Sequence, residues 1–120
     1  MTHILVIDDE EQIRSFLKTL LTNAGYSVTV ASEGEEGIKL YQKYNTDLVI
    51  TDIVMPGKEG IATIAGLLEI NPDLKIIAIS GGGKILPAGY LHTAKLIGAV
   101  TTLKKPVRKD NLLKIIKELI

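Results

Sequence analysis

Short apolar runs alternate along this chain with segments in which apolar residues recur every three or four positions. The runs are nearly continuous, and most are rich in β-branched residues, which is typical of strands that are covered on both faces of a sheet. We therefore predict five strands, at residues 4–7, 28–31, 48–51, 76–79 and 99–103.

Each predicted strand is followed by a segment with helical periodicity. The apolar face of the first helix consists of Ile13, Phe16, Leu17, Leu20 and Leu21. The helix dipole favours Glu10 and Glu11 at the start of this helix. Gly25 is suited to the left-handed conformation that commonly ends a helix.

The other four predicted helices are marked by their ends or by their apolar stripes. Residues 32–35 form a capping-box pattern before the second helix. The stripe of the third helix consists of Ile61, Ile64, Ala65 and Leu68, and Asn71-Pro72 ends it. Pro87 starts the fourth helix and Gly98 ends it. The stripe of the fifth consists of Leu112, Ile115, Ile116 and Leu119.

Five repeats of strand and helix with short connections predict an α/β fold. It is a single doubly wound, open parallel sheet with helices on both faces. A closed barrel would need eight such units, which this chain lacks. We expect one domain over residues 1–120 and no output domain.

The composition is that of an ordinary globular protein, with 46% hydrophobic and 23% charged residues in 120. The absence of cysteine excludes disulfides and thiolate metal sites. No apolar run approaches the ~20 residues of a membrane span, and no signal peptide is visible at the N-terminus. We therefore expect a cytoplasmic protein without membrane association.

The charge is divided unevenly, although the net charge is zero. Residues 1–83 contain 6 basic and 12 acidic residues, a net of −6, and residues 84–120 contain 8 basic and 2 acidic residues, a net of +6. The basic part is either a solvated face of the last helices or a surface for an acidic protein partner. Because no series of aromatic residues is interleaved with the basic ones, we do not expect direct nucleic-acid binding.

Polar residues follow four of the five predicted strands. They are Asp8 and Asp9 after the first, Asp52 after the third, Ser80 after the fourth, and Lys104 and Lys105 before Pro106 after the fifth. In open α/β sheets, ligands bind outside the carboxyl ends of the strands, where the strand order reverses. We expect these side chains to converge there.

Three converging carboxylates need a cation. Two carboxylates ~4 Å apart repel by about 4 kcal/mol at an effective dielectric constant near ~20. Oxygen ligands without histidine or cysteine indicate a hard ion such as Mg²⁺, which uses one or two carboxylates together with phosphate oxygens. A carboxylate in such a site can attack phosphorus and form an aspartyl phosphate, while the metal and an ammonium group neutralise the transferring group.

Each of these residues alone has an ordinary explanation. Aspartate is a common turn residue after a strand, and Ser80 before three glycines is typical of a turn. Lys105 before Pro106 is typical of a surface residue where a helix begins. The combination at four strand ends is what favours a functional site.

These motifs resemble the receiver domain of bacterial response regulators, the CheY-like family. The resemblance rests on residues 8–9, 52–57, 80–81 and 105–106 in this order, and it covers essentially the whole chain. It implies a flavodoxin-like fold with strand order 2-1-3-4-5 and five helices.

The resemblance also implies a role in two-component signalling. A sensor histidine kinase or a histidine phosphotransfer protein would donate a phosphoryl group to Asp52. Asp9, Asp52 and the backbone carbonyl of Val54 would bind Mg²⁺, with Asp8 acting mainly through a water. Ser80 would hydrogen-bond the phosphoryl group and Lys105 would pair with it. The chain would not be an enzyme beyond its own phosphorylation and slow self-dephosphorylation.

The sequence departs from the family in the residues that relay the signal. Thr102 stands where the family usually has tyrosine or phenylalanine, and Val107 where phenylalanine is common. We expect a readout without an aromatic switch, on the face of the fourth helix, fifth strand and fifth helix. A second stripe of Leu113, Ile116 and Ile120 is either core or an interface, for a downstream protein or a phosphorylation-linked dimer.

Two other classes of function remain open. One is a small Mg²⁺-dependent phosphohydrolase, and the other is a pseudo-receiver that binds proteins and is never phosphorylated. Residues 81–84 lack the spacing of a phosphate-binding loop. His3 and His92 have no second ligand at metal spacing, so we expect both to be structural or on the surface.

Overall fold

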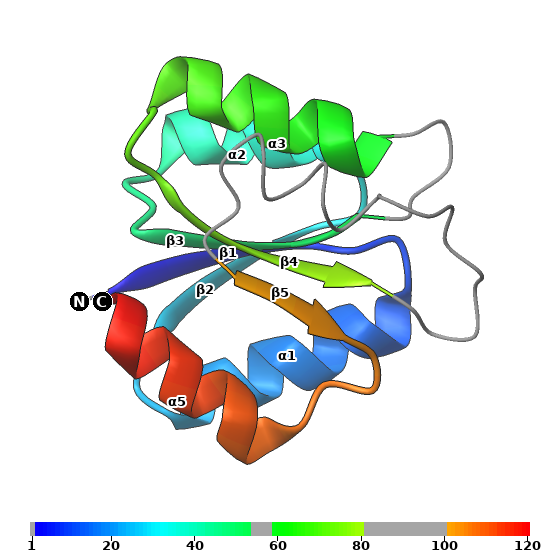
Figure 1. The fold of residues 1–120 in the computed structure, drawn as a ribbon, viewed down its shortest axis with the longest axis vertical. Coiled ribbons are helices and arrows are strands. Elements are labelled where there is room, and N and C mark those ends of the chain that lie inside the picture. Colours follow the sequence, from blue (N-terminus) through cyan, green and yellow to red (C-terminus); the bar gives the residue numbers. More distant parts are fainter. Residues whose placement is uncertain (1, 54–58, 81–100) are drawn as a thin grey trace.

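The computed structural model describes residues 2–53, 59–80 and 101–120 (Figure 1). The elements, in chain order, are β1 (His3–Ile7), α1 (Glu11–Asn23), β2 (Ser27–Ala31), α2 (Gly34–Lys43), β3 (Leu48–Asp52), α3 (Glu59–Ile70), β4 (Lys75–Ser80), β5 (Thr101–Lys104) and α5 (Lys109–Leu119).

The five strands form one parallel sheet in the order β2-β1-β3-β4-β5, which confirms the predicted fold class and strand order. Helices α2 and α3 cover one face and α1 and α5 cover the other (Figure 1). The predicted fourth helix, from Pro87 to Gly98, lies outside the described residues, as does the start of the predicted fifth strand. Among the helices that are described, none has the length and apolar character needed to cross a membrane.

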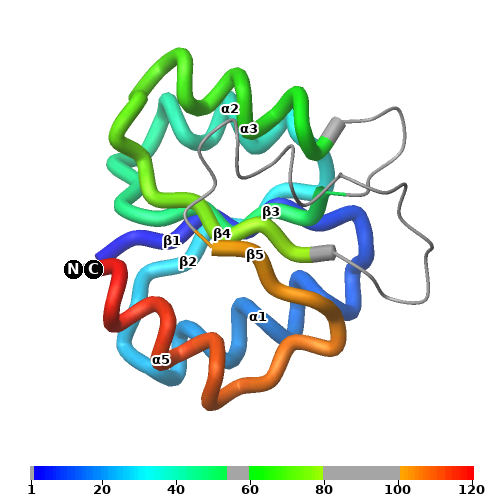
Figure 2. The backbone as a smooth tube through the Cα atoms, in the orientation of Figure 1, coloured from blue at the N-terminus to red at the C-terminus, as the bar shows by residue number. Residues whose placement is uncertain are grey.

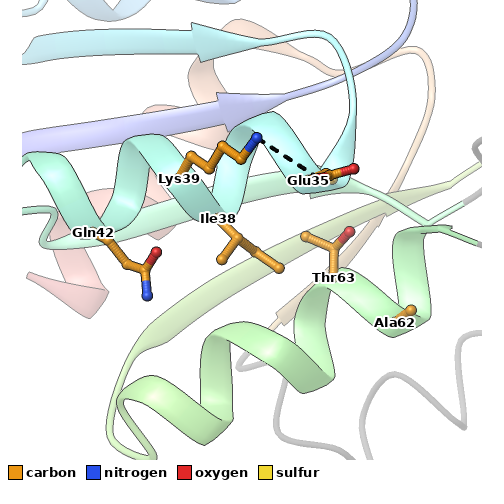
Figure 3. A pocket seen from close by; sticks show the side chains of 7 residues that line it. Glu35, Ile38, Lys39, Gln42, Ala62 and Thr63 are labelled. Carbon is orange, nitrogen blue, oxygen red and sulfur yellow. Dashed lines mark ion pairs between the residues drawn. The ribbon is translucent and has the colours of Figure 1, made fainter.

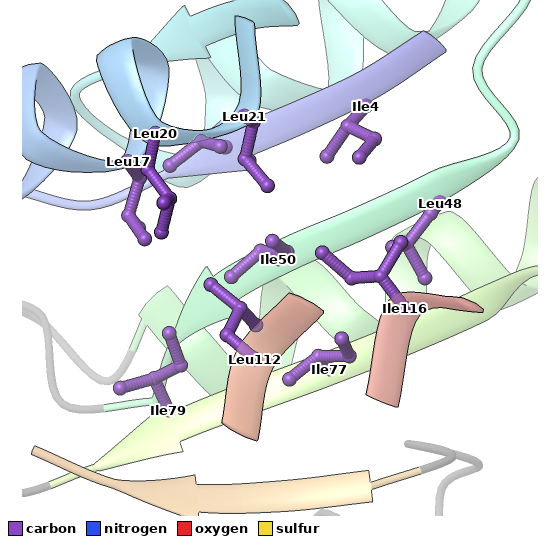
Figure 4. Packing of buried hydrophobic residues seen from close by; sticks show 11 residues of the cluster. Ile4, Leu17, Leu20, Leu21, Leu48, Ile50, Ile77, Ile79, Leu112 and Ile116 are labelled. Atoms are coloured by element: carbon purple, nitrogen blue, oxygen red, sulfur yellow. The ribbon is translucent and has the colours of Figure 1, made fainter. Parts of the chain in front are cut away.

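The central strands β1, β3 and β4 are buried on both faces, which explains their continuous apolar sequences. On β1, Leu5 and Ile7 pack in the cluster under α2 and α3, whereas Ile4 and Val6 pack under α1 and α5. All four are 0% exposed. Figure 4 shows the second cluster, in which leucines of α1 and α5 contact isoleucines of the sheet. Each fully buried side chain of this size contributes roughly 1.5–3 kcal/mol to folding.

All five strands end at the same edge of the sheet, because every neighbouring pair is parallel (Figure 2). We call this the carboxyl edge. It is formed by the ends of the strands, at Ile7, Ala31, Asp52, Ser80 and Lys104. The polar residues singled out in the sequence lie at this edge or directly after it.

One predicted helix end is confirmed. Gly25 has φ of 99°, in the left-handed region. The N–H groups of Gly25 and Tyr26 donate to the carbonyls of Thr22 and Leu21 at 3.0 and 3.1 Å, which is a Schellman ending.

The predicted capping box at residues 32–35 is wrong in its detail. Helix α2 begins at Gly34, so the residue that reaches back is one position later than expected. The backbone N–H of Ser32 donates to Oε1 of Glu36 at 2.8 Å. Glu35 instead pairs with Lys39 at 3.7 Å.

Two helices bury faces that differ from the predicted ones. Phe16 of α1 is 45% exposed, because this helix buries a narrower stripe of Leu17, Leu20 and Leu21. On α3, Ala65 is exposed whereas Leu67 is fully buried. The face of α3 is therefore rotated relative to the predicted stripe.

Candidate functional site

Asp8 and Asp52 come together at the carboxyl edge because their strands are neighbours. β1 and β3 pair in parallel with Ile7 opposite Thr51, so the next residue of each strand is one of these aspartates. Both aspartates are 2% exposed. Two buried carboxylates this close need a compensating charge.

Lys105, the residue after β5, supplies that charge. Its Nζ lies 3.0 Å from Oδ2 of Asp52 and 3.2 Å from Oδ2 of Asp8. The Lys105 side chain is 4% exposed, whereas Lys104 is exposed. Of the two lysines at the end of β5, Lys105 is therefore the one that the structure brings to the carboxylates.

Glu10 also belongs to this site, although the sequence analysis assigned it only to the start of a helix. Its Oε1 lies 2.8 Å from Nζ of Lys105, closer than either aspartate oxygen. The available signal was that Glu10 is the third consecutive acidic residue after β1. Helical periodicity gave no indication that its side chain turns toward the sheet edge.

Hydrogen bonds hold the loop after β1 in place. The backbone N–H of Glu10 donates to Oδ1 of Asp8 at 2.8 Å, which is an Asx-type turn. Nη1 of Arg14, in the first turn of α1, donates to the backbone carbonyl of Asp8 at 2.7 Å. Together these contacts orient the Asp8 carboxylate and place Glu10 beside Lys105.

Burial and charge shift the pKa of two groups in the site. Burial raises the pKa of Asp8, and the charge of Asp52 raises it further, against the lowering effects of the Glu10 N–H and Lys105. Burial lowers the pKa of Lys105, but hydrogen bonds to Glu10 and Asp52, together with the aspartate charges, raise it by more. The net pKa of Lys105 is above its ordinary value, so Lys105 is a cation at neutral pH.

The acidic residues of the site fit a hard divalent cation. Among the described residues, Asp8, Asp9, Glu10 and Asp52 each offer a carboxylate oxygen, and these oxygens lie within 4.8 Å of one another. Oxygen-only ligands are those that Mg²⁺ prefers. Carboxylates this close repel one another, so bound positive charge is favoured at this cluster. Val54 lies outside the described residues, so its part in a metal site stays a prediction.

The remaining predicted residues lie at or near the carboxyl edge. The backbone of Ser80 ends β4 in register with Lys104, and the contact predicted for its hydroxyl stays a prediction. Thr102 is half-buried on β5, opposite Ala78. Val107 packs against the core under α1 and α5.

His3 is structural, in accord with the sequence analysis. Its Nδ1 lies 3.0 Å from Oγ of Ser27 and its Nε2 lies 2.7 Å from Oγ1 of Thr29, so the ring ties β1 to β2. These contacts lie at the start of β1, at the edge opposite the carboxylates. His92 lies outside the described residues.

An open groove of about 430 Å³ lies between α2 and α3 (Figure 3). Its lining residues are Gly34, Glu35, Ile38, Lys39, Gln42, Ala62 and Thr63. None of them belongs to the acidic cluster. The groove is therefore separate from the acidic cluster around Asp52.

Comparison with known proteins agrees with this geometry. Residues 4–117 match the family described as the response regulator receiver domain. The chain therefore belongs to that family, which confirms the resemblance seen in the sequence.

Two curated relatives show how much of each protein is shared. The transcriptional regulatory protein GlrR of Escherichia coli is 34% identical over 110 residues, 92% of this chain and 24% of GlrR. The chemotaxis protein CheY of Thermotoga maritima is 38% identical over 82 residues, 68% of each protein. The chain spans only 24% to 31% of the length of GlrR and two other transcriptional regulators that it matches.

A solved structure agrees over the whole fold. The response regulator protein TrrA of Thermotoga maritima is 33% identical, with a TM-score of 0.86 over 100% of both chains. TrrA is described in complex with Mg(2+)-BeF.

Proposed function

We propose that this receiver domain is a phosphoacceptor switch in which Asp52 receives a phosphoryl group. The observation that carries the proposal is the position of Asp52, buried at the carboxyl edge and 3.0 Å from Lys105 within a group of carboxylates. The proposed donor is a phosphohistidine on a sensor histidine kinase or a histidine phosphotransfer protein. The proposed recipient of the signal is another protein.

The chemistry would proceed at the Asp52 carboxylate. One of its oxygens attacks the phosphorus, and a new O–P bond forms as the P–N bond of the phosphohistidine breaks. The electron pair of the broken bond leaves with the imidazole nitrogen. Lys105, already charged and 3.0 Å from Oδ2 of Asp52, donates a hydrogen bond to the transferred group, and Ser80 is the proposed second donor.

Mg²⁺ is the proposed cofactor of this site. When bound by Asp8, Asp9, Asp52 and the Val54 carbonyl, it would supply positive charge to the phosphoryl oxygens. The four carboxylates support this assignment, because their oxygens lie within 4.8 Å of one another and a divalent cation would offset their repulsion. The complex of TrrA with Mg(2+)-BeF supports it as well.

The proposed output face is formed by the fourth helix, β5 and α5. Of these, the structure describes β5 and α5. Leu113 of α5 is half-buried and packs against the core, and Ile120 is 52% exposed at the end of the chain. The proposed partners of this face are a downstream protein target and, in a phosphorylation-linked dimer, a second copy of the chain.

Phosphoryl uptake from a small acyl phosphate tests the proposed function. We expect the intact mass to rise by one phosphoryl group when Mg²⁺ is present, and to stay unchanged with a chelator. Asp52→Asn should abolish the uptake. Asp73→Asn is a matched control, because Asp73 is exposed in the turn before β4 and makes no part of the acidic cluster.

A pseudo-receiver gives a different result in the same experiment. Absence of uptake in the parent, at saturating Mg²⁺ and donor, would contradict the proposal. Equal uptake by the parent and by Asp52→Asn would show that phosphorylation occurs elsewhere.

A further inference from the structure

The Lys105 ammonium has as many carboxylate partners as it has N–H groups. An ammonium carries three N–H donors and no acceptor. Its nitrogen lies 2.8 Å from Glu10, 3.0 Å from Asp52 and 3.2 Å from Asp8. Each N–H therefore already has a charged oxygen within reach.

A phosphoryl group on Asp52 would have to enter this arrangement as a new acceptor. Its oxygens carry more negative charge than the carboxylate they replace, so they compete for the same N–H groups. Lys105 can serve one phosphoryl oxygen with the N–H that faces Asp52, because acylation removes the charge of that carboxylate. It can serve a second phosphoryl oxygen only by weakening its contact with Asp8 or with Glu10.

The partners differ in how firmly they are held. The Asp8 side chain is 2% exposed, and loss of its ammonium partner would leave a buried charge. The Glu10 side chain is 44% exposed, so water can replace Lys105 as its partner. The backbone N–H of Glu10 also binds Asp8, and this contact can persist while the side chain turns outward.

We propose that Glu10 is a positioning residue that restrains the Lys105 ammonium before phosphorylation and gives it up when the phosphoryl group arrives on Asp52. This inference rests on the proposed function. The role lies in the contact of the Glu10 side chain with Lys105, whereas neighbouring Glu11, in the first turn of α1, carries the same charge at the start of this helix. Glu10 then acts as a brake on phosphoryl transfer.

The test compares Glu10→Gln with Glu11→Gln, which makes the same change in net charge one residue later. Phosphoryl uptake is timed with a small acyl phosphate at saturating Mg²⁺. We expect Glu10→Gln to react about two- to five-fold faster than Glu11→Gln, the range set by the loss of a solvated ion pair. A rate equal to or below that of Glu11→Gln would overturn the inference.

A second readout follows the ammonium without any phosphodonor. Nitrogen-15 NMR measures how fast the Lys105 ammonium hydrogens exchange with water. We expect faster exchange in Glu10→Gln than in the parent or in Glu11→Gln, and identical exchange in all three would also overturn the inference. If the parent takes up no phosphoryl group, the proposed function itself fails. If the parent is phosphorylated and the two variants react alike, only the role of Glu10 fails.

Discussion

Lys105 connects residues that are far apart in the sequence and close together in the fold. Its buried ammonium lies against the loop after β1 and against the end of β3. Asp8 and Asp52 are too buried to be stabilised by water. The free energy of folding therefore depends in part on the Lys105 cation when no metal is bound.

We predict that Lys105→Met lowers the stability of the metal-free protein by roughly 3–5 kcal/mol at neutral pH, the usual effect of breaking a buried ion pair. The pKa of Asp8 is raised in the folded protein, so stability is lost as the pH rises from the ordinary aspartate pKa through the raised one. The charge and hydrogen bond of Lys105 lower this pKa, so the pKa of Asp8 should be higher still in Lys105→Met. The stability deficit should therefore shrink as the pH falls toward the ordinary aspartate range.

Urea unfolding at several pH values, with and without Mg²⁺, measures this effect. Lys104→Met is the control, since Lys104 is exposed and should change stability by less than about 0.5 kcal/mol. Mg²⁺ should restore more stability to Lys105→Met than to the parent. A pH-independent deficit would show that Lys105 acts by packing alone.

At this scale the sequence analysis brought together Asp8, Asp52 and Lys105, because the carboxyl ends of parallel strands share one edge. It missed the role of Glu10. Strand periodicity ends at Ile7, and the path of the next few residues depends on the turn at Asp8 and on Arg14. Such side chain-to-backbone contacts leave no periodic signal.

At the scale of the elements, the first turn of α3 packs closely on the backbone of Ile53, the residue after Asp52. A side-chain carbon at Gly60 would lie 2.0 Å from the carbonyl oxygen of Ile53. Only glycine allows this approach of helix to backbone. The position of Ile53, and with it the direction in which the chain leaves β3, thus depends on the first turn of α3.

We predict that Gly60→Ala destabilises the fold by about 1–3 kcal/mol, because the backbone of residue 53 must move. Gly66→Ala is the control on the same helix, where the added carbon meets only the flexible end of Ile38 at 3.0 Å. Alanine favours a helix over glycine by up to about 1 kcal/mol, so this variant should be close to neutral or stabilising.

Thermal unfolding compares the two variants, and NMR of the Asp52 amide reports on the site. We expect the amide resonance to shift in Gly60→Ala and to stay in place in Gly66→Ala. Equal melting temperatures for both variants would contradict the close approach at residue 60.

The strands were the most predictable elements, and all five overlap their predicted positions to within two residues over the described part of the chain. The apolar sequences of β1, β3 and β4 are continuous because both of their faces are buried, whereas the edge strands β2 and β5 are half-buried. Helix faces were less predictable. Phe16 has the right spacing for the core, but it lies at the edge of the apolar stripe of α1 and is exposed. Periodicity gives the direction of such a stripe and not the width that the sheet and the neighbouring helices cover.

At the scale of the whole molecule, strand order determines which residues meet. The order β2-β1-β3-β4-β5 puts β1 and β3 side by side at the centre, and Lys105 reaches their ends from the far strand β5. The alternation of strands and helices predicts a parallel sheet, but it leaves the order open. The order came from the family resemblance, which the structure and the comparisons confirm.

The most direct measurement of the central claim is to locate the phosphoryl group in the chain. The protein is incubated with Mg²⁺ and a small acyl phosphate, and borohydride then reduces the acyl phosphate to an alcohol. Peptide mass spectrometry identifies the reduced residue. Our account predicts that reduction converts Asp52 and no other aspartate or glutamate. Reduction at Asp8, Asp9 or Glu10 with Asp52 unchanged would contradict it.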